Sequence, residues 1–200
     1  DNSEIGATKD GKITAATATF RLQAGAFPGS PIRGAVGCGF APYDIANIHV
    51  VGLDVVCDRP KATAYRAPGA PIGAYPVECV LDEVAATLKL DPLLLRLKNA
   101  AKEGTRAAYG PIFTRIGYEE TLRAALQHPH YKAPLGPNQG RGVASGFWFN
   151  AGGESSAQVN INEDGQLSSP LVIPMWGDHV LRPSTLQRNC SASTTARSKR

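Results

Sequence analysis

The sequence predicts an α+β domain over residues 1–168, with a mixed sheet and packed helices. Apolar and polar side chains alternate in residues 12–24, which is typical of a strand, and residues 48–58 are apolar and β-branched. Apolar side chains recur at helical spacing in residues 76–89 and 91–102. The hydrophobic share of 42% in 200 residues is sufficient for a buried core, and no apolar run reaches the length of a membrane span.

The first half of the chain is expected to contain a hairpin, a loop and a second strand. Asp10–Gly11 is a turn signal that predicts one strand before it and the strand 12–24 after it. Residues 25–43 are rich in Gly and Pro and predict a loop rather than a long helix. The strand 48–58 is expected to be largely buried. Residues 65–76 contain three Pro and two Gly, so we expect no regular structure there.

Three helices are expected to follow. Pro76 suits the first turn of the helix 76–89, in which Glu78, Asp82 and Glu83 are predicted to form a solvated face. Asp91 is the predicted N-cap of the helix 91–102, with Pro92 at its first position.

The remaining pattern predicts a third helix over residues 117–127 and a linker over residues 128–140. Residues 141–149 and 156–163 are expected to pair as strands around Gly152–Gly153.

The charge distribution argues against a nucleic-acid partner. Residues 1–168 carry sixteen basic and sixteen acidic side chains, so the excess of +4 comes from residues 169–200, with five basic residues against Asp178. The tail also lacks the interleaved aromatic residues that bind nucleic acid. Neither the four distant cysteines nor the histidines have the spacing of a metal or iron–sulfur site, so we predict no metal ligands and reduced thiols in the cytoplasm.

Arg66 is the first candidate functional residue. It lies in a loop of small residues between a predicted strand and a helix, where backbone N–H groups favour anions and an arginine can orient a phosphate or oxo group. The alternative is a rigid connector whose arginine caps a carbonyl group. The residues alone leave both interpretations open.

The order of residues resembles a known family. AYRAPGAPIGAYPVE, followed by LDEVAATLKLDPLLLRLKNA, closely resembles the large-subunit signature of molybdenum hydroxylases of the xanthine dehydrogenase/aldehyde oxidase type. APYDIANIHV upstream and GRGVASGFWFNAGGESSAQVNINEDG downstream resemble the flanking segments of that family, so the resemblance covers about residues 10–168. The matching positions are Arg66, Gly69, Pro71, Glu78, Asp82–Glu83, Asp91–Pro92 and Arg96-Leu97-Lys98-Asn99.

The resemblance implies a cofactor-binding loop and a substrate channel. Arg66, with Ala67 and Gly69, matches the loop beside the molybdenum–molybdopterin cofactor, and Pro68 and Gly153 match positions near the channel. Pro68 replaces a stacking phenylalanine, which puts purine hydroxylation in doubt. Phe147 is a further channel candidate, with core packing as its alternative. No cysteine directly follows Arg66, so the copper-binding loop of carbon monoxide dehydrogenases is absent.

The resemblance also implies the activity of a parent enzyme. Such an enzyme hydroxylates an aldehyde or heteroaromatic carbon with water as the oxygen source. Its pterin is expected in a dinucleotide form, with FAD and 2Fe-2S clusters on partner chains. The catalytic glutamate of the family lies much further along, so we assign no catalytic residue here and expect this fragment to be inactive alone. The alternative is a truncated, inert remnant that binds no cofactor.

Residues 169–200 depart from the pattern of the preceding chain. Their composition shifts to Ser, Thr, Arg and Pro, as in a disordered tail. The codons for Met175–His179, read two bases later with suitable third positions, encode Val-Gly-Gly-Ser-Arg, and the segment 186–191 shifts in the same frame to Ala-Glu-Glu-Leu-Leu-Gly. The restored text resembles the next cofactor-binding segment of the family. Our hypothesis is a frameshift near residues 168–172, which resequencing of the gene tests directly.

Overall fold

The computed structural model describes residues 2–149, 160–161, 163 and 167–168. The chain divides into two units, Asp1–Phe149 and Asn150–Arg200. In the second unit, β4 (Asn160–Ile161) and β5 (Leu167–Ser168) pair antiparallel. The predicted tail 169–200 and Gly153 lie outside the described residues.

The first unit contains a mixed three-stranded sheet, as predicted. Its strands are β1 (Asn2–Ala7), β2 (Ile13–Gly25) and β3 (Asn47–Val56), in the order β1-β2-β3. The strands β1 and β2 are antiparallel on either side of Asp10–Gly11, which confirms the predicted hairpin. The strand β3 runs parallel to β2, and a parallel pair needs a crossover connection.

The helix α1 (Ile32–Cys38) lies in that connection, so the prediction of a loop over residues 25–43 was wrong for this part. Glycine is a poor helix former, so the Gly-rich composition of this segment does not predict a helix. The packing of α1 explains why Gly34 is present, because a Cβ atom at this position would lie 1.9 Å from the carbonyl oxygen of Pro68. Tertiary packing therefore outweighs the low helix propensity of this segment.

The helix α2 (Ala70–Leu88) begins six residues before the predicted start at Pro76. The expectation that residues 65–76 are irregular was therefore wrong from Ala70 onward. Pro71 fits the first turn, where a helix needs no N–H donor. Pro76 lies inside the helix, where it removes one backbone hydrogen bond.

The later helices agree better with the sequence pattern. The helix α3 (Pro92–Lys98) begins as predicted but ends before residue 102, and α4 (Tyr118–Gln127) matches the predicted third helix. The short α5 (Pro129–Lys132) lies within the predicted linker. Residues 141–149 form no strand, and β4 pairs with β5 instead of this segment.

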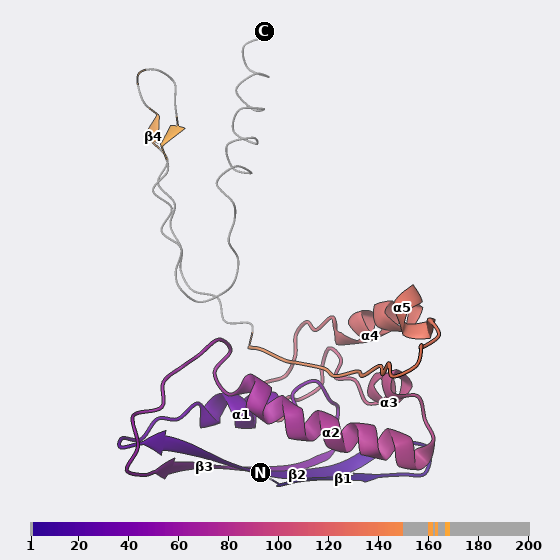
Figure 1. The fold of residues 1–200 in the computed structure, drawn as a ribbon, viewed down its shortest axis with the longest axis horizontal. Coiled ribbons are helices and arrows are strands. Elements are labelled where there is room, and N and C mark those ends of the chain that lie inside the picture. Colours follow the sequence, from indigo (N-terminus) through magenta and orange to yellow (C-terminus); the bar gives the residue numbers. More distant parts are fainter. Residues whose placement is uncertain (1, 150–159, 162, 164–166, 169–200) are drawn as a thin grey trace. The chain divides into compact units, whose positions relative to one another are not determined.

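The hydrophobic core lies between the sheet and the helices. Figure 1 shows α1 and α2 on the same face of the sheet. The buried side chains that fill this space include Phe20, Phe40, Tyr43, Val77 and Leu81. The other face is uncovered in the described residues, so Leu53 and Val55 of β3 are each 42% exposed. The prediction that this strand is largely buried was wrong, because helices cover one of its two faces. None of the described helices is long and apolar enough to cross a membrane.

We predict that Gly34→Ala lowers the free energy of unfolding by about 1–3 kcal/mol, because the new Cβ forces α1 away from the Pro68 carbonyl. The same change in an exposed helix would stabilise the protein by about 0.5–1 kcal/mol. Urea denaturation of the full chain measures the effect. Gly142→Ala is the control, since a Cβ there meets no atom within 4 Å. Equal stability of the two variants would contradict the close packing described for α1.

Candidate functional site

The candidate site begins at the loop that leads into α2. Tyr65 and Arg66 are exposed at this loop, whereas Gly69 is buried beneath it. Ala67 has φ of 50° and Gly69 has φ of 85°, so both residues occupy the left-handed region. This conformation is costly for an alanine and tends to occur at binding sites that hold the chain in one particular shape.

Backbone contacts hold this loop against α1. A Cβ atom on Gly69 would lie 2.0 Å from the carbonyl oxygen of Pro31, immediately before α1. The carbonyl group of Pro68, the residue before Gly69, lies close to Gly34 of α1. These two close approaches hold the loop backbone against α1, and the Arg66 side chain is exposed at the surface.

The electrostatics of the loop suit an anionic group. The helix α2 has 19 residues, and its N-cap Gly69 provides no side-chain hydrogen bond to the first turn. No acidic residue lies in that turn. The positive end of the helix dipole and the Arg66 guanidinium therefore lie in the same segment, which fits a phosphate-bearing cofactor. The Ala70 N–H already donates to the Ala67 carbonyl and Pro71 has no N–H, so the segment offers an anion the Arg66 cation and the positive end of the helix dipole.

A buried charge cluster lies further along α2. Glu78 is 5% exposed, and Arg96 of α3 is fully buried. Arg96 donates from Nε to Glu78 at 2.9 Å and from Nη2 to Asp82 at 2.8 Å. Glu78 also accepts the backbone N–H of Ser145 at 2.8 Å and the hydroxyl of Tyr43. The prediction of a solvated acidic face was therefore wrong for Glu78.

Burial and the neighbouring charges set the protonation states in this cluster. Burial raises the pKa of Tyr43 well above its usual value, and the adjacent Glu78 carboxylate raises it further. Burial also raises the pKa of Tyr118. For Arg96, burial opposes the charged form, but Glu78 and the other partners outweigh this effect and its pKa is raised. Tyr43 and Tyr118 are therefore neutral at neutral pH, and Arg96 is charged.

Three further residues from the recognised pattern stabilise the fold. The Asp91 side chain accepts the N–H groups of Leu93 and Leu94, which confirms the predicted N-cap. Lys98 hydrogen-bonds the Asp10 carboxylate at 2.6 Å and lowers its pKa to about 2. Asn99 is fully buried, accepts the Ile13 N–H and donates to the Gly11 carbonyl. The bonds of Lys98 and Asn99 attach the end of the helix α3 to the β1–β2 hairpin.

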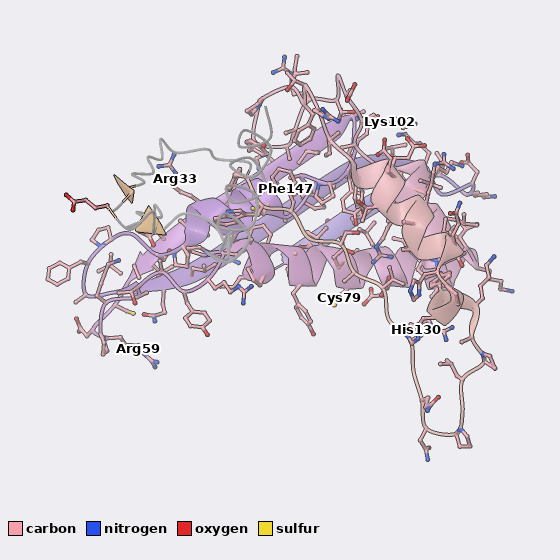
Figure 2. All side chains as sticks on the ribbon, turned by 90° about the horizontal axis from the view of Figure 1, so that it is seen from above. Arg33, Arg59, Cys79, Lys102, His130 and Phe147 are labelled. Carbon is pink, nitrogen blue, oxygen red and sulfur yellow. The ribbon has the colours of Figure 1, made fainter. Side chains whose placement is uncertain are left out.

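A groove of about 490 Å³ lies beside α4. Its walls include Leu93, Tyr118, Leu122, Phe147 and Trp148. In Figure 2, Phe147 lies over the helical side of the first unit, whereas Lys102 and Arg59 lie at its periphery.

Phe147 also belongs to an aromatic cluster, because its ring centroid lies 5.9 Å from that of Tyr109, 5.8 Å from that of Phe113 and 5.8 Å from that of Phe149. Phe147 therefore both lines the groove and packs against other aromatic rings, and its place in a substrate channel stays a prediction.

The helix α1 connects this cluster with the Arg66 loop. A Cβ on Gly37 would lie 2.6 Å from the Phe149 ring, one turn along α1 from the contact between Gly34 and Pro68. The loop contains the consecutive residues Arg66, Ala67, Pro68 and Gly69. Phe147 contacts Phe149, and Phe149 packs against α1 at Gly37. Gly153 lies outside the described residues.

Sequence reasoning missed three contributors: Gly34, Tyr118 and Ser145. Gly34 is needed because α1 lies close to the Pro68 carbonyl at this position. The sequence does not predict this contact, because several other glycines surround Gly34. Tyr118 and Ser145 are ordinary residues in the sequence, and only their approach to Glu78 and the groove distinguishes them.

Comparison with known proteins places this arrangement in a family. The model of the molybdopterin cofactor-binding domain matches residues 2–100, which include the Arg66 loop, Glu78 and Arg96. Residues 2–100 belong to the molybdopterin cofactor-binding domain family. Together with the relatives described next, this match confirms the resemblance to xanthine dehydrogenase and aldehyde oxidase large subunits.

Two curated relatives align beyond this domain. This chain is 29% identical over 192 residues to an aldehyde oxidoreductase of Megalodesulfovibrio gigas, covering 89% of this chain and 21% of the relative. It is 31% identical over 129 residues to the nicotinate dehydrogenase large molybdopterin subunit of Eubacterium barkeri, covering 62% and 30%. The chain thus spans about a fifth to a third of the length of these relatives.

Solved structures agree with the α+β prediction for this chain. The aldehyde oxidoreductase from Desulfovibrio desulfuricans superposes with a TM-score of 0.60 at 27% identity, covering 84% of this chain and 20% of that one. The enzyme from Desulfovibrio gigas superposes with a TM-score of 0.57 at 24% identity. Both likenesses confirm a mixed sheet with packed helices.

We predict that Arg96→Ala lowers the free energy of unfolding by about 3–5 kcal/mol, because it leaves the buried Glu78 carboxylate without its cation. Lys98→Ala on the same helix is the control. It removes an ion pair with the exposed Asp10, so its effect is expected to be small. Urea denaturation of both variants measures the difference. Similar stability of the two variants would show that Arg96 does not hold this domain together.

Proposed function

We propose that this chain forms one wall of the cofactor site in the large subunit of a molybdenum hydroxylase. The observation that carries the proposal is the Arg66 loop, whose backbone is fixed against α1 while its arginine is exposed beside an uncapped helix start. The parent enzyme would oxidise an aldehyde or a heteroaromatic carbon. The names of the relatives, an aldehyde oxidoreductase and a nicotinate dehydrogenase subunit, support both substrate classes.

The residues of the loop have distinct parts in this proposal. Arg66 would bind a negatively charged part of molybdopterin in its dinucleotide form, with Ala67 beside it in the wall of the cofactor site. Gly69 would serve this site by letting the loop pack directly against the backbone of Pro31. When bound, the cofactor supplies the redox chemistry that adds an oxygen atom from water to the substrate carbon. Pro68, Phe147 and Gly153 would line the route of the substrate.

The partners follow from the same proposal. Electrons removed from the substrate need acceptors, and we propose FAD and 2Fe-2S clusters on partner chains. Among the described residues, no group of three His, Cys, Asp or Glu side chains forms a metal site. Cys38, Cys57 and Cys79 are free thiols, which supports the cytoplasm as the location.

We predict that Arg66→Ala lowers the molybdenum content of the parent enzyme by about tenfold, because a charge-assisted hydrogen bond of roughly 1.4 kcal/mol is lost. Metal analysis of the purified complex, after co-expression with its partner subunits, measures molybdenum per large subunit. Arg66→Lys keeps the charge without the paired donors and is expected to fall between the wild type and the alanine variant.

Arg123→Ala is the matched control, since Arg123 is an exposed arginine on α4 paired with Glu119. It should leave the molybdenum content unchanged. A full molybdenum content in Arg66→Ala would remove the proposed role of the loop. If the wild-type complex itself retains no molybdenum, the inert remnant becomes the better description of this chain.

A further inference from the structure

We infer that β3 becomes an interior strand in the whole large subunit, where a segment outside this chain pairs with its free edge and covers its outer face. In the described part of the chain, β3 is the last strand in the sheet order β1-β2-β3, so only β2 pairs with it. The inference rests on the proposed function in one respect, since it places this chain inside a longer large subunit. It concerns the assembly of that subunit and requires no bound cofactor.

The composition of β3 is typical of a strand with neighbours on both sides. Its sequence, NIHVVGLDVV, contains six branched apolar side chains in ten residues. Val50 packs against the hydrophobic core, whereas Leu53 and Val55 are each 42% exposed and Val56 is 51% exposed. Nearly continuous apolar strands are typical of parallel pairs that are covered on both faces. The strand therefore exposes more apolar surface at this edge than its pattern suits.

The register of the sheet places Leu53 and Val55 on its outer face. Leu53 lies beside Arg21 of β2. Val55 lies beside Gln23 of the same strand. Successive side chains of a strand point to opposite faces, and Phe20 is fully buried in the core beneath the helices. Arg21 and its neighbour Leu53 therefore point away from the helices, and the outer face of β3 carries an apolar strip in its C-terminal half.

The two edges of the sheet differ in their protection against pairing. The strand β1 has six residues, carries the exposed carboxylate of Glu4 and has a register shift near its end. Short length, charges and bulges are the features that keep an edge strand from pairing further. The strand β3 has ten residues and contains no lysine, arginine or proline. Its one carboxylate, Asp54, accepts the N–H groups of Gly29 and Ser30 at 2.7 and 3.0 Å, so it is bound within the first unit.

The length of the relatives points to the occupant of this edge. The chain covers about a fifth of the aldehyde oxidoreductases described above. A subunit of that length has ample chain for a further strand. We therefore assign the edge to an extended segment of the same subunit, with apolar side chains beside Leu53 and Val55. The competing occupant is a second copy of this chain.

Hydrogen exchange at single-residue resolution tests the inference by comparing the 200-residue chain with the parent enzyme. Successive N–H groups of a strand point to opposite edges, so only alternate amides of β3 bond to β2. In the isolated chain, slow and fast amides should therefore alternate along β3. In the parent enzyme, exchange of the fast amides should slow by at least about tenfold, because each gains a hydrogen bond.

Leu53→Lys should affect the two proteins differently. In the isolated chain, the lysine stem covers the same neighbouring surface and its ammonium group reaches water, so the melting temperature should fall by less than about 2 °C. In the parent enzyme, the covering segment would enclose the ammonium group, and the melting temperature should fall by about 5 °C or more. Glu4→Lys on β1 is the control and should have a small effect in both proteins.

Fast exchange along β3 in the parent enzyme would overturn the inference, as would equal effects of Leu53→Lys in the two proteins. A dimer of the isolated chain that Leu53→Lys abolishes, with no added protection in the parent enzyme, would assign the edge to a second copy instead. Molybdenum content is measured on the same preparations. A protected β3 in a complex without molybdenum would support this inference and contradict the proposed cofactor site, whereas full molybdenum with an unprotected β3 would do the reverse.

Discussion

The ion pair between Arg96 and Glu78 is the contact on which the rest of the first unit depends. A buried arginine is tolerated only when its charge and its donors are satisfied, and here Glu78 and Asp82 satisfy them. Glu78 in turn accepts from Tyr43 and from the backbone of Ser145. One carboxylate therefore connects α2, α3, the segment before β3 and the wall of the groove.

The sequence predicted the positions of β2 and β3, the hairpin turn and α4 well, because each of these elements has a pattern of its own. The strand expected over residues 141–149 is absent from the structure. Prediction also failed at α1 and at the start of α2, where glycine and proline normally interrupt structure. In those segments the low propensity is overcome by contacts across the fold, such as Gly34 against Pro68. The burial of Glu78 could not be predicted from the sequence either. Helical periodicity places Glu78 on the polar side of α2, and burial is favourable only because Arg96 of α3 pairs with its carboxylate.

The recognised pattern of residues combines two different roles. Glu78, Asp82, Arg96 and Asn99 make buried or partly buried contacts that assemble the domain. Arg66 lies in the exposed loop in front of α2. Much of the signature by which this chain resembles its relatives thus encodes contacts that assemble the domain, and a short portion encodes the proposed cofactor contact. Sequence similarity can report the shared scaffold faithfully while leaving the substrate open.

The main-chain contacts that hold the Arg66 loop against α1 determine which of its positions can vary. The positions of Pro68 and Gly69 are set by main-chain atoms of α1, whereas the side chains of Tyr65, Arg66 and Ile72 are exposed. Mutation at these outward positions can alter the chemistry presented to a ligand while the supporting framework keeps its shape. Substitutions at these exposed positions can therefore change the surface of the loop without disturbing the contacts that hold it in the fold.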